Sequence, residues 1–299
     1  MKKRGFLIYP STTPRENNAF EWFREAAAAY GIELEVLFYS TPAVQAPEGA
    51  PDWEPDFVIM RGYNISLSRW YESRGVKVIN TTESMLLSRD KYRSAGALAL
   101  AGIPVPRTFM FHGDSVPAYP EITTSPFILK LNYGSKGENV FLIDCERGYR
   151  EALEACSREK LMRIEALDRG ICEFGETLEE IGYGCTPLIQ EFISASSGRD
   201  IRVWVTGDEI AGHILRYNPS GFKSNFAAGG SYRRIPLPQE AASTALAAVR
   251  TSGLFFAGVD LLFDSSGGFK VCEINGNAGF RTASADIPDA LFRNLVKIL

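Results

Sequence analysis

The chain has 299 residues, of which 45% are apolar and 23% are charged, and its formal net charge is −4. The length indicates about two domains and a sizeable core. The composition is that of an ordinary globular protein and excludes a disordered or fibrous class. A weakly acidic chain has no basic field, so we expect neither nucleic acid nor an anionic membrane as a partner.

The chain shows no targeting segment or membrane span, and its cysteines indicate a reducing compartment. The apolar run at residues 6–9 stops at Pro10, far short of a signal-peptide core, and no stretch approaches the roughly 20 apolar residues of a transmembrane helix. The five cysteines are scattered and never spaced as C-x-x-C: Cys145, Cys156, Cys172, Cys185 and Cys272. We therefore expect reduced thiols and a cytoplasmic location. With only His112 and His213, a zinc site or a histidine-based triad has few candidates.

Residues 5–80 alternate between apolar strands and helical patterns. The strands are predicted at residues 5–9, 33–39, 57–60 and 76–79, and a helix at residues 19–31. This alternation indicates a small α/β domain with a parallel sheet. The stretch at residues 41–56 is rich in proline and alanine and is predicted to be a loop.

A second region begins with a helix predicted at residues 84–101, preceded by N-cap candidates at residues 81–84. Short strands at residues 108–111, 126–131 and 139–143 are predicted to form a small, mostly antiparallel lobe. One or two surface helices are expected within residues 147–182. Further strands are predicted at residues 187–193, 200–205, 209–217, 258–263 and 269–274, with a helix at residues 238–251.

The last two of these strands are predicted to pair as a β-hairpin, because the turn-forming residues 264–268 separate them. With a loop at residues 265–268, Asp260 lies directly opposite Glu273. Asn275 points to the same face as Glu273, since strand side chains alternate. Two carboxylates and an amide oxygen are the hard ligands that Mg²⁺ prefers. The alternative is a solvent-facing polar strip, but the flanking residues are apolar and like charges facing each other repel.

Two lysines are candidates for holding phosphate groups. Lys130 lies inside an apolar strand, where a buried ammonium without an anion is costly. A ligand phosphate would satisfy it, and the adjacent glycine loop at residues 134–137 could close over that phosphate with backbone N–H groups. An ordinary hairpin turn is the alternative for this loop. Lys91 lies at the start of a helix, where a solvated salt bridge is an equally simple role.

A third group of polar residues lies on the strands that follow. One strand ends at a Ser/Gly loop, so its last backbone groups are free to pair with a flat group such as adenine; the segment is Gln190, Glu191, Phe192 and Ile193. Asp200 could accept hydrogen bonds from ribose hydroxyls. Arg202 and Arg216 lie on successive predicted strands and could bind phosphoryl or carboxylate oxygens in bidentate fashion. A surface ion pair is the alternative for each of them taken singly.

The order of these signals resembles the ATP-grasp superfamily and, within it, the RimK-like branch of glutamate and amino-acid ligases. The resemblance covers about residues 80–299 and rests on six short sequences: Ser88-Arg89-Asp90-Lys91, Ile128-Leu129-Lys130-Leu131, Gln190-Glu191-Phe192-Ile193, Asp200-Ile201-Arg202, Gly258-Val259-Asp260 and Glu273-Ile274-Asn275-Gly276. It implies an α/β (α+β) fold, namely an ATP-grasp fold with an N-terminal Rossmann-like pre-ATP-grasp domain. The implied parts are an N-terminal domain at residues 1–87, a central lobe with the glycine loop at 88–187, and a C-terminal lobe with the metal site at 188–299. Arg61 lies where such an N-terminal domain often meets substrate.

The resemblance also implies a role for each group of residues. ATP would lie between the two lobes, with its α- and β-phosphates on Lys91 and Lys130, adenine on the backbone around Glu191 and ribose on Asp200. The family's loop near the phosphates is matched by Lys223, Ser224 and Asn225. Two Mg²⁺ ions, or Mn²⁺ in their place, would be held by Asp260, Glu273 and Asn275.

The implied reaction is the ATP-dependent ligation of a carboxylate to an amine, which releases ADP and phosphate. A substrate carboxylate would attack the γ-phosphorus, and the acyl phosphate would react with the amine, with Arg202 and Arg216 stabilising the charge that develops. The expected partners are a small-molecule or peptide carboxylate and an amine, such as the amino acid glutamate, and the chain is expected to form a homo-oligomer. Two alternatives are an ATP-binding regulatory module without turnover and a kinase that releases no inorganic phosphate.

The chain departs from the family pattern in two places. Residues 275–279 lack the proline and the serine of the sequence Asn-x-Ser-Pro-Gly that often follows the metal carboxylate, and Arg216 stands alone where relatives frequently have two arginines. The first of these loops normally helps to shape the acceptor pocket. The resemblance therefore does not imply which molecule is the acceptor.

Overall fold

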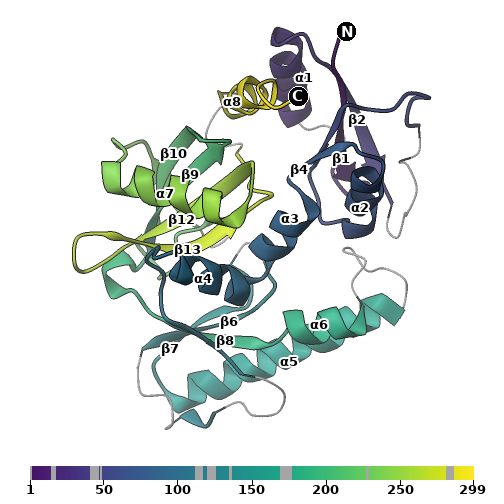
Figure 1. Cartoon of the computed structure of the whole chain (residues 1–299). Coiled ribbons are helices and arrows are strands. Elements are labelled where there is room, and N and C mark those ends of the chain that lie inside the picture. Colours follow the sequence, from purple (N-terminus) through teal and green to yellow (C-terminus); the bar gives the residue numbers. More distant parts are fainter. Residues whose placement is uncertain are drawn as a thin grey trace.

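The computed structural model describes residues 2–14, 18–40, 47, 49–111, 117–119, 126–134, 137–168, 177–226, 229–280 and 286–299. These residues form three β-sheets with helices packed against them (Figure 1). One sheet belongs to the N-terminal domain, one to a central lobe and one to a C-terminal lobe. No helix in the described part of the chain is long and apolar enough to cross a membrane.

The N-terminal sheet has four parallel strands in the order β2-β1-β3-β4, which confirms the predicted parallel sheet. The strands are β1 (Arg4–Pro10), β2 (Glu33–Tyr39), β3 (Phe57–Met60) and β4 (Lys77–Ile79). α1 (Asn18–Ala29) packs on one face through Phe23, and α2 (Ile65–Ser73) packs on the other through Leu67. Because both faces are covered, the strands are nearly continuous apolar runs, and this makes them visible in the sequence.

The long helix predicted for residues 84–101 is wrong in one respect, because the structure has two helices there. α3 (Thr82–Arg89) ends and α4 (Lys91–Leu100) begins at Asp90. The Asp90 backbone is extended, with φ −85° and ψ 97°, and its side chain accepts a hydrogen bond from the backbone N–H three residues later. Aspartate favours this N-cap position because its carboxylate satisfies a free N–H at the start of a helix. The break places Lys91 in the first turn of α4.

The central lobe is an antiparallel sheet, as predicted, and its strand order is β5-β8-β6-β7, with β8 added to the three strands that were expected. The strands are β5 (Thr108–Met110), β6 (Phe127–Leu131), β7 (Val140–Ile143) and β8 (Pro187–Glu191). α5 (Glu146–Asp168) and α6 (Leu178–Gly184) cover one face, where Phe127 and Leu129 are buried. Since side chains alternate along a strand, Lys130 points to the face away from these helices.

The C-terminal lobe contains an antiparallel sheet in the order β11-β10-β9-β12-β13. The strands are β9 (Arg199–Thr206), β10 (Glu209–Tyr217), β11 (Ser231–Arg233), β12 (Phe256–Phe263) and β13 (Phe269–Asn275). α7 (Gln239–Ser252) covers one face. The chain enters this lobe from β8 through a short 3₁₀ turn, η2 (Ser194–Ser196). β8 itself pairs in the central sheet, so the central lobe continues past the predicted boundary at residue 187.

The helix α8 (Asp286–Leu295), which the sequence analysis did not predict, joins the C-terminal lobe to the N-terminal domain. It packs on α1 and on β10, and Figure 1 shows it beside α1. The ring of Phe23 lies 5.5 Å from that of Phe280 and 6.2 Å from that of Phe292. One apolar core therefore extends from the N-terminal sheet into the C-terminal lobe, which fixes the two against each other.

The hairpin of β12 and β13 confirms the predicted pairing of Asp260 with Glu273 but not the predicted loop. The loop is Asp264 to Gly268, one residue longer than expected, because Phe263 pairs with Phe269. The register then shifts after Leu261 pairs with Val271, and Cys272 is the extra residue of a β-bulge. The longer loop and the bulge compensate each other, so the two carboxylates still face one another.

Candidate active site

Two arginines and two aspartates form a buried ion-pair cluster on neighbouring strands of the C-terminal sheet. The register places Arg202 beside Asp260 and Arg216 beside Asp200. Arg202 donates to both carboxylate oxygens of Asp260, at 2.6 Å each. Arg216, 4% exposed, donates to Asp200 through Nε at 2.7 Å and contacts Asp260 through Nη2 at 2.7 Å. A single guanidinium therefore links the two aspartates.

Burial and charge act in opposite directions on the pKa values of this cluster. Burial raises the pKa of Asp260, but the charges of Arg202 and Arg216 outweigh it and lower that pKa to about 2. At Asp200 burial outweighs the charge of Arg216, so the pKa is raised. Burial also disfavours the cationic form of Arg216, yet the two aspartates outweigh it and raise its pKa. Arg216 is thus held charged, and the aspartates keep both predicted catalytic arginines in a fixed orientation.

The two predicted phosphate-binding lysines are held by neutral oxygens. The ammonium of Lys130, 4% exposed, donates to Oε1 of Gln190 at 2.9 Å. The ammonium of Lys91 donates to the carbonyl oxygens of Asn132, at 3.3 Å, and Gly134, at 2.7 Å. Neither lysine forms an ion pair with a carboxylate of the described residues. Two cations without a bound carboxylate are what a site for an anionic ligand requires.

The bulge residue Cys272 shows that the candidate residues converge. Burial raises the pKa of its thiol to about 11, and the charges of Lys130, Glu273, Asp260 and Asp200 also act on it. Contacts between the two lobes agree with this, since Glu191 of β8 pairs with Lys270 of β13 at 3.2 Å and Lys223 donates to the Gly137 carbonyl at 2.9 Å. Side chains from the central and C-terminal sheets therefore lie near one another around Cys272, and the nucleotide site between the two lobes stays a prediction.

The predicted metal ligands fit a metal that arrives with a ligand rather than a closed protein site. No described residue donates a hydrogen bond to the Glu273 carboxylate, whereas Oδ1 of Asn275 accepts from the Asn277 N–H at 2.8 Å. The oxygens of Asp260 already accept from two arginines. No group of three or more His, Cys, Asp or Glu side chains in the described ranges could hold a metal ion by itself. Phosphate oxygens and water would have to complete the shell of Mg²⁺, which is its usual habit.

The segment predicted to bind adenine lies where β8 leaves the central sheet. Two of its residues end the strand and two follow it: Gln190, Glu191, Phe192 and Ile193. The side chain of Gln190 accepts from Lys130 and donates through Nε2 to the Thr108 hydroxyl at 2.9 Å. Gln190 therefore positions Lys130, and the adenine contact of the backbone beyond it stays a prediction.

Two other predicted nucleotide ligands are engaged in ion pairs. The carboxylate of Glu191 lies 3.2 Å from the ammonium of Lys270, which ties β8 of the central lobe to β13 of the C-terminal lobe. The carboxylate of Asp200 accepts from Arg216 and from the Ser224 hydroxyl, the latter at 2.7 Å, and is 6% exposed. The ribose contact of Asp200 stays a prediction, and its observed partners show that it orients Arg216.

The segment Lys223, Ser224 and Asn225 brings the C-terminal lobe against the glycine loop. The ammonium of Lys223 donates to the Gly137 carbonyl at 2.9 Å. Gly137 has φ +74°, a conformation that favours glycine, and a Cβ atom there would lie 2.4 Å from Nδ2 of Asn225 and displace that side chain. Residues 135 and 136, the middle of the predicted glycine loop, lie outside the described residues.

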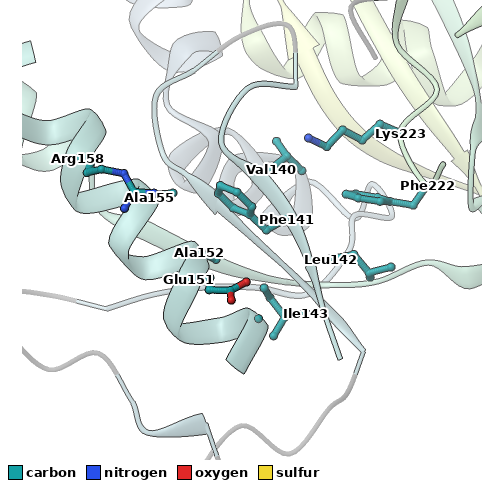
Figure 2. Close-up of a pocket in the computed structure, with 11 residues that line it drawn as sticks. Val140, Phe141, Leu142, Ile143, Glu151, Ala152, Ala155, Arg158, Phe222 and Lys223 are labelled. Atoms are coloured by element: carbon teal, nitrogen blue, oxygen red, sulfur yellow. The ribbon is translucent and has the colours of Figure 1, made fainter. Parts of the chain in front are cut away.

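A cavity of about 480 Å³ borders the site along the outer edge of β7. Figure 2 shows β7 lying between α5 and the segment that carries Phe222 and Lys223. Among the predicted site residues, Lys223 lines this cavity, and the arginine–aspartate cluster does not. The cavity is therefore adjacent to the candidate site and separate from its charged centre.

The profile of the RimK-like ATP-grasp domain matches residues 88–299. The chain belongs to the RimK-like ATP-grasp family. Among curated relatives, it is 31% identical over 242 residues to a probable alpha-L-glutamate ligase of Pseudomonas paraeruginosa, covering 79% of this chain and 72% of the relative. It is 27% identical over 293 residues to a probable alpha-L-glutamate ligase of Haemophilus influenzae, covering 88% and 90%.

Solved structures share the fold of this RimK-like chain. A RimK domain ATP-grasp protein from Sphaerobacter thermophilus superposes with a TM-score of 0.68 at 21% identity, covering 97% of this chain and 98% of the other. The D-alanine–D-alanine ligase of Bacillus anthracis gives 0.69 at 15% identity, with 99% and 98% covered. An ATP-grasp ligase solved with a precursor peptide variant, Mg and ADP gives 0.63 at 16% identity, with 99% and 98% covered. At these identities the likeness shows the ATP-grasp fold.

Two polar residues at the site of this RimK-like chain were missed by the sequence analysis. Asn132, fully buried two residues after Lys130, accepts a hydrogen bond at Oδ1 from the Tyr92 N–H at 3.0 Å, and its Nδ2 has no partner among the described residues. An asparagine directly after the strand that carries Lys130, a predicted phosphate ligand, was the signal available for it. Burial raises the pKa of Tyr63, on which the charge of Glu273 also acts. Nothing in the sequence around Tyr63 indicated that the charge of Glu273 acts on it.

Nucleotide affinity is expected to fall as the pH rises, because burial lowers the pKa of Lys91 to about 8. Below that pH the ammonium is charged and attracts phosphate, and above it the neutral amine does not. If the bound nucleotide keeps Lys91 charged, the ADP dissociation constant should rise about tenfold between pH 7 and pH 9. Isothermal titration calorimetry across this range measures the effect.

The control is Lys91→Arg, since the guanidinium stays charged throughout this range. Its ADP affinity should be flat between the same pH values, whatever its absolute level. An identical fall in the two proteins would show that another group titrates and that Lys91 does not contact phosphate.

Proposed function

We propose that this protein joins a carboxylic acid to an amine through an acyl phosphate, with release of ADP and phosphate. Membership of the RimK-like ATP-grasp family makes the chain an ATP-dependent ligase that uses Mg²⁺. The observation that supports the proposal is the grouping, near Cys272, of two lysines without a carboxylate partner and one carboxylate without a hydrogen-bond donor, both among the described residues, together with two arginines in fixed orientations. The lysines and arginines offer positive charge to the phosphate oxygens of a triphosphate, and the carboxylate can bind the Mg²⁺ that accompanies it.

In the proposed complex ATP lies between the central and C-terminal lobes. Lys91 and Lys130 hold the α- and β-phosphates, and the backbone after Gln190 contacts adenine. The contact between Lys223 and Gly137 supports a role for residues 223–225 in holding the glycine loop closed over the phosphates. A closed loop would exclude water and protect an acyl phosphate from hydrolysis.

Two Mg²⁺ ions are proposed to bind at Glu273, Asn275 and Asp260, together with phosphate oxygens. Bound there, the metal would neutralise the triphosphate and polarise the γ-phosphoryl group. Glu273 supports this role best, because its carboxylate has no described hydrogen-bond donor and faces the region of Lys91. Asp260 would share its charge with Arg202 and Arg216.

The two arginines are proposed to stabilise the negative charge that develops during transfer. Arg202 and Arg216 are held rigidly by Asp260 and Asp200, so they need little reorganisation when charge appears on the phosphoryl oxygens or on the tetrahedral oxyanion. The attacking atoms belong to the two substrates: a carboxylate oxygen attacks phosphorus, and the amine nitrogen attacks the acyl carbon. No protein nucleophile is needed.

The proposed substrates are an amino acid such as glutamate and a second molecule that carries a carboxylate or an amine. This follows from the two curated relatives described above, both of which are named probable alpha-L-glutamate ligases. The loop at residues 275–279 departs from the family sequence, so the acceptor is proposed to differ among relatives. The four described cysteines are free thiols, which supports a cytoplasmic location, and a homo-oligomeric assembly remains part of the proposal.

The function is tested by incubating the protein with ATP, Mg²⁺, mixed amino acids and small carboxylates, followed by mass spectrometry of the products. We expect a product whose mass is the sum of two substrates minus water, formed in step with ADP and phosphate. A regulatory module would bind ATP without any product. A kinase would give a phosphorylated product and ADP without phosphate.

A further inference from the structure

The side chain of Asn80, which follows β4 of the N-terminal domain, holds the base of the candidate metal-binding hairpin. It is 3% exposed. Its Nδ2 donates to the carbonyl oxygens of Phe256 and Gly276, each at 2.8 Å. Its Oδ1 accepts from the backbone N–H groups of Phe255 and Phe256, each at 2.8 Å. These four bonds use the full capacity of an amide side chain, two donors and two acceptor positions.

The four hydrogen bonds fix both strands of the hairpin at once. Phe256 begins β12, the strand that carries Asp260, and Gly276 directly follows Asn275, the last residue of β13. One planar amide therefore sets how far apart the two strand ends lie. Any shift of Asn275 along its strand would break the bond between Asn80 and Gly276.

The same segment is also enclosed by Met85 of α3, which contacts Asn80, and by Leu254, which precedes β12. A Cβ atom on Gly276 would lie 2.6 Å from Sδ of Met85 and 2.8 Å from Cδ2 of Leu254, so the backbone has no room to move toward them. A further contact from the N-terminal domain acts on this loop, since Nη2 of Arg61 donates to the Ala278 carbonyl at 2.9 Å. The carboxyl ends of β3 and β4 thus both hold the loop that follows the candidate metal ligands.

We infer that Asn80 is a positioning residue for the metal site: its amide sets the position of Asn275 and Glu273 relative to the nucleotide phosphates. This inference rests on the proposed metal-binding role of these two residues. Asn80 contacts none of the candidate metal ligands, because its bonds go to the backbone groups of Phe255, Phe256 and Gly276 and to Sδ of Met85, the last at 3.7 Å. Groups that orient metal ligands typically contribute about 10- to 100-fold to metal affinity.

Binding of Mn²⁺ to the complex with ADP, followed by electron paramagnetic resonance, tests this without knowledge of the substrate. We expect Asn80→Ala to weaken Mn²⁺ binding about tenfold or more, while ADP binding in the absence of metal changes little. Asn294→Ala is the matched control, because Asn294 is also buried in the C-terminal lobe and donates to Thr206, Glu209 and Ala290. A merely structural role for Asn80 would lower the melting temperature in both variants and leave Mn²⁺ affinity unchanged in both.

Two further variants keep the test decisive. Gly276→Ala displaces the same segment from the α3 side with Asn80 in place, so it should weaken Mn²⁺ binding even if Asn80→Ala does not fold. Normal Mn²⁺ affinity in either Asn80→Ala or Gly276→Ala would overturn the inference. Glu273→Gln separates the two proposals: if it binds Mn²⁺ normally, the metal site itself is wrong, whereas if it loses Mn²⁺ and Asn80→Ala does not, only the role of Asn80 fails.

Discussion

Glu273→Gln should reduce ATP-dependent phosphate release by at least about 10³-fold, equivalent to roughly 4 kcal/mol of lost transition-state stabilisation. The substitution keeps the size of the side chain and removes one negative charge from a position where no described residue donates to it. Lys91 and Lys130 remain, so the dissociation constant for ADP without metal should change by less than about threefold. A coupled phosphate assay with the substrate pool and calorimetry with ADP measure the two quantities.

A suitable control is Glu240→Gln, which removes the same charge from an exposed position at the start of α7. It should leave both quantities unchanged. Phosphate release near the normal rate in Glu273→Gln would refute the metal assignment. Loss of ADP binding as large as the loss of turnover would instead show that Glu273 supports the nucleotide site as a whole.

Arg216→Met should destabilise the protein by about 3–5 kcal/mol, because it leaves two buried carboxylates without their common partner. Asp200 and Asp260 both contact Nη2 of Arg216 in the present protein. Without that guanidinium their repulsion raises the folded-state pKa of one of them above its unfolded value. The folded state then binds more protons than the unfolded state, so the variant should lose stability as the pH rises from 4 to 8. Urea denaturation at several pH values measures this.

Two controls show whether the loss comes from the buried charges. Arg250→Met removes an arginine whose ion pair with Asp208 is largely exposed, and should cost no more than about 1 kcal/mol. Adding Asp200→Asn to Arg216→Met removes one of the two repelling charges and should recover part of the stability. If Arg216→Met is as stable as Arg250→Met, the cluster does not hold the site together.

The sequence predicted the parts of the fold that depend on local pattern. The strands of the N-terminal sheet are apolar runs between turn signals, and the pairing of Asp260 with Glu273 follows from alternation and a recognisable turn. The exact loop could not be predicted. The observed loop is one residue longer than expected, and the bulge at Cys272 adds one residue to β13, so the two differences cancel and Asp260 still pairs with Glu273. The break between α3 and α4 had a signal in the sequence, namely Asp90 inside a helical pattern. Whether an aspartate ends a helix depends on what the following turn packs against, which the sequence does not show.

The interactions between distant segments could not be predicted in the same way. The choice of Asp200 and Asp260 as partners of Arg216 depends on the order of strands β10, β9 and β12, which the pattern of one sequence does not give. Likewise, the contacts of Asn80 with Phe256 and Gly276 span more than 170 residues. The helix α8 was not predicted; it contains Pro288, which its third position places in the first turn, where proline is tolerated.

The formation of an acyl phosphate is the central claim, and transfer of oxygen isotope tests it most directly. The carboxylate substrates of the pool are labelled with ¹⁸O, and the phosphate released during amide formation is analysed by mass spectrometry. Attack of the carboxylate on phosphorus followed by aminolysis leaves one substrate oxygen on phosphate, so we expect one ¹⁸O atom per phosphate. Amide formation accompanied by unlabelled phosphate would contradict the account.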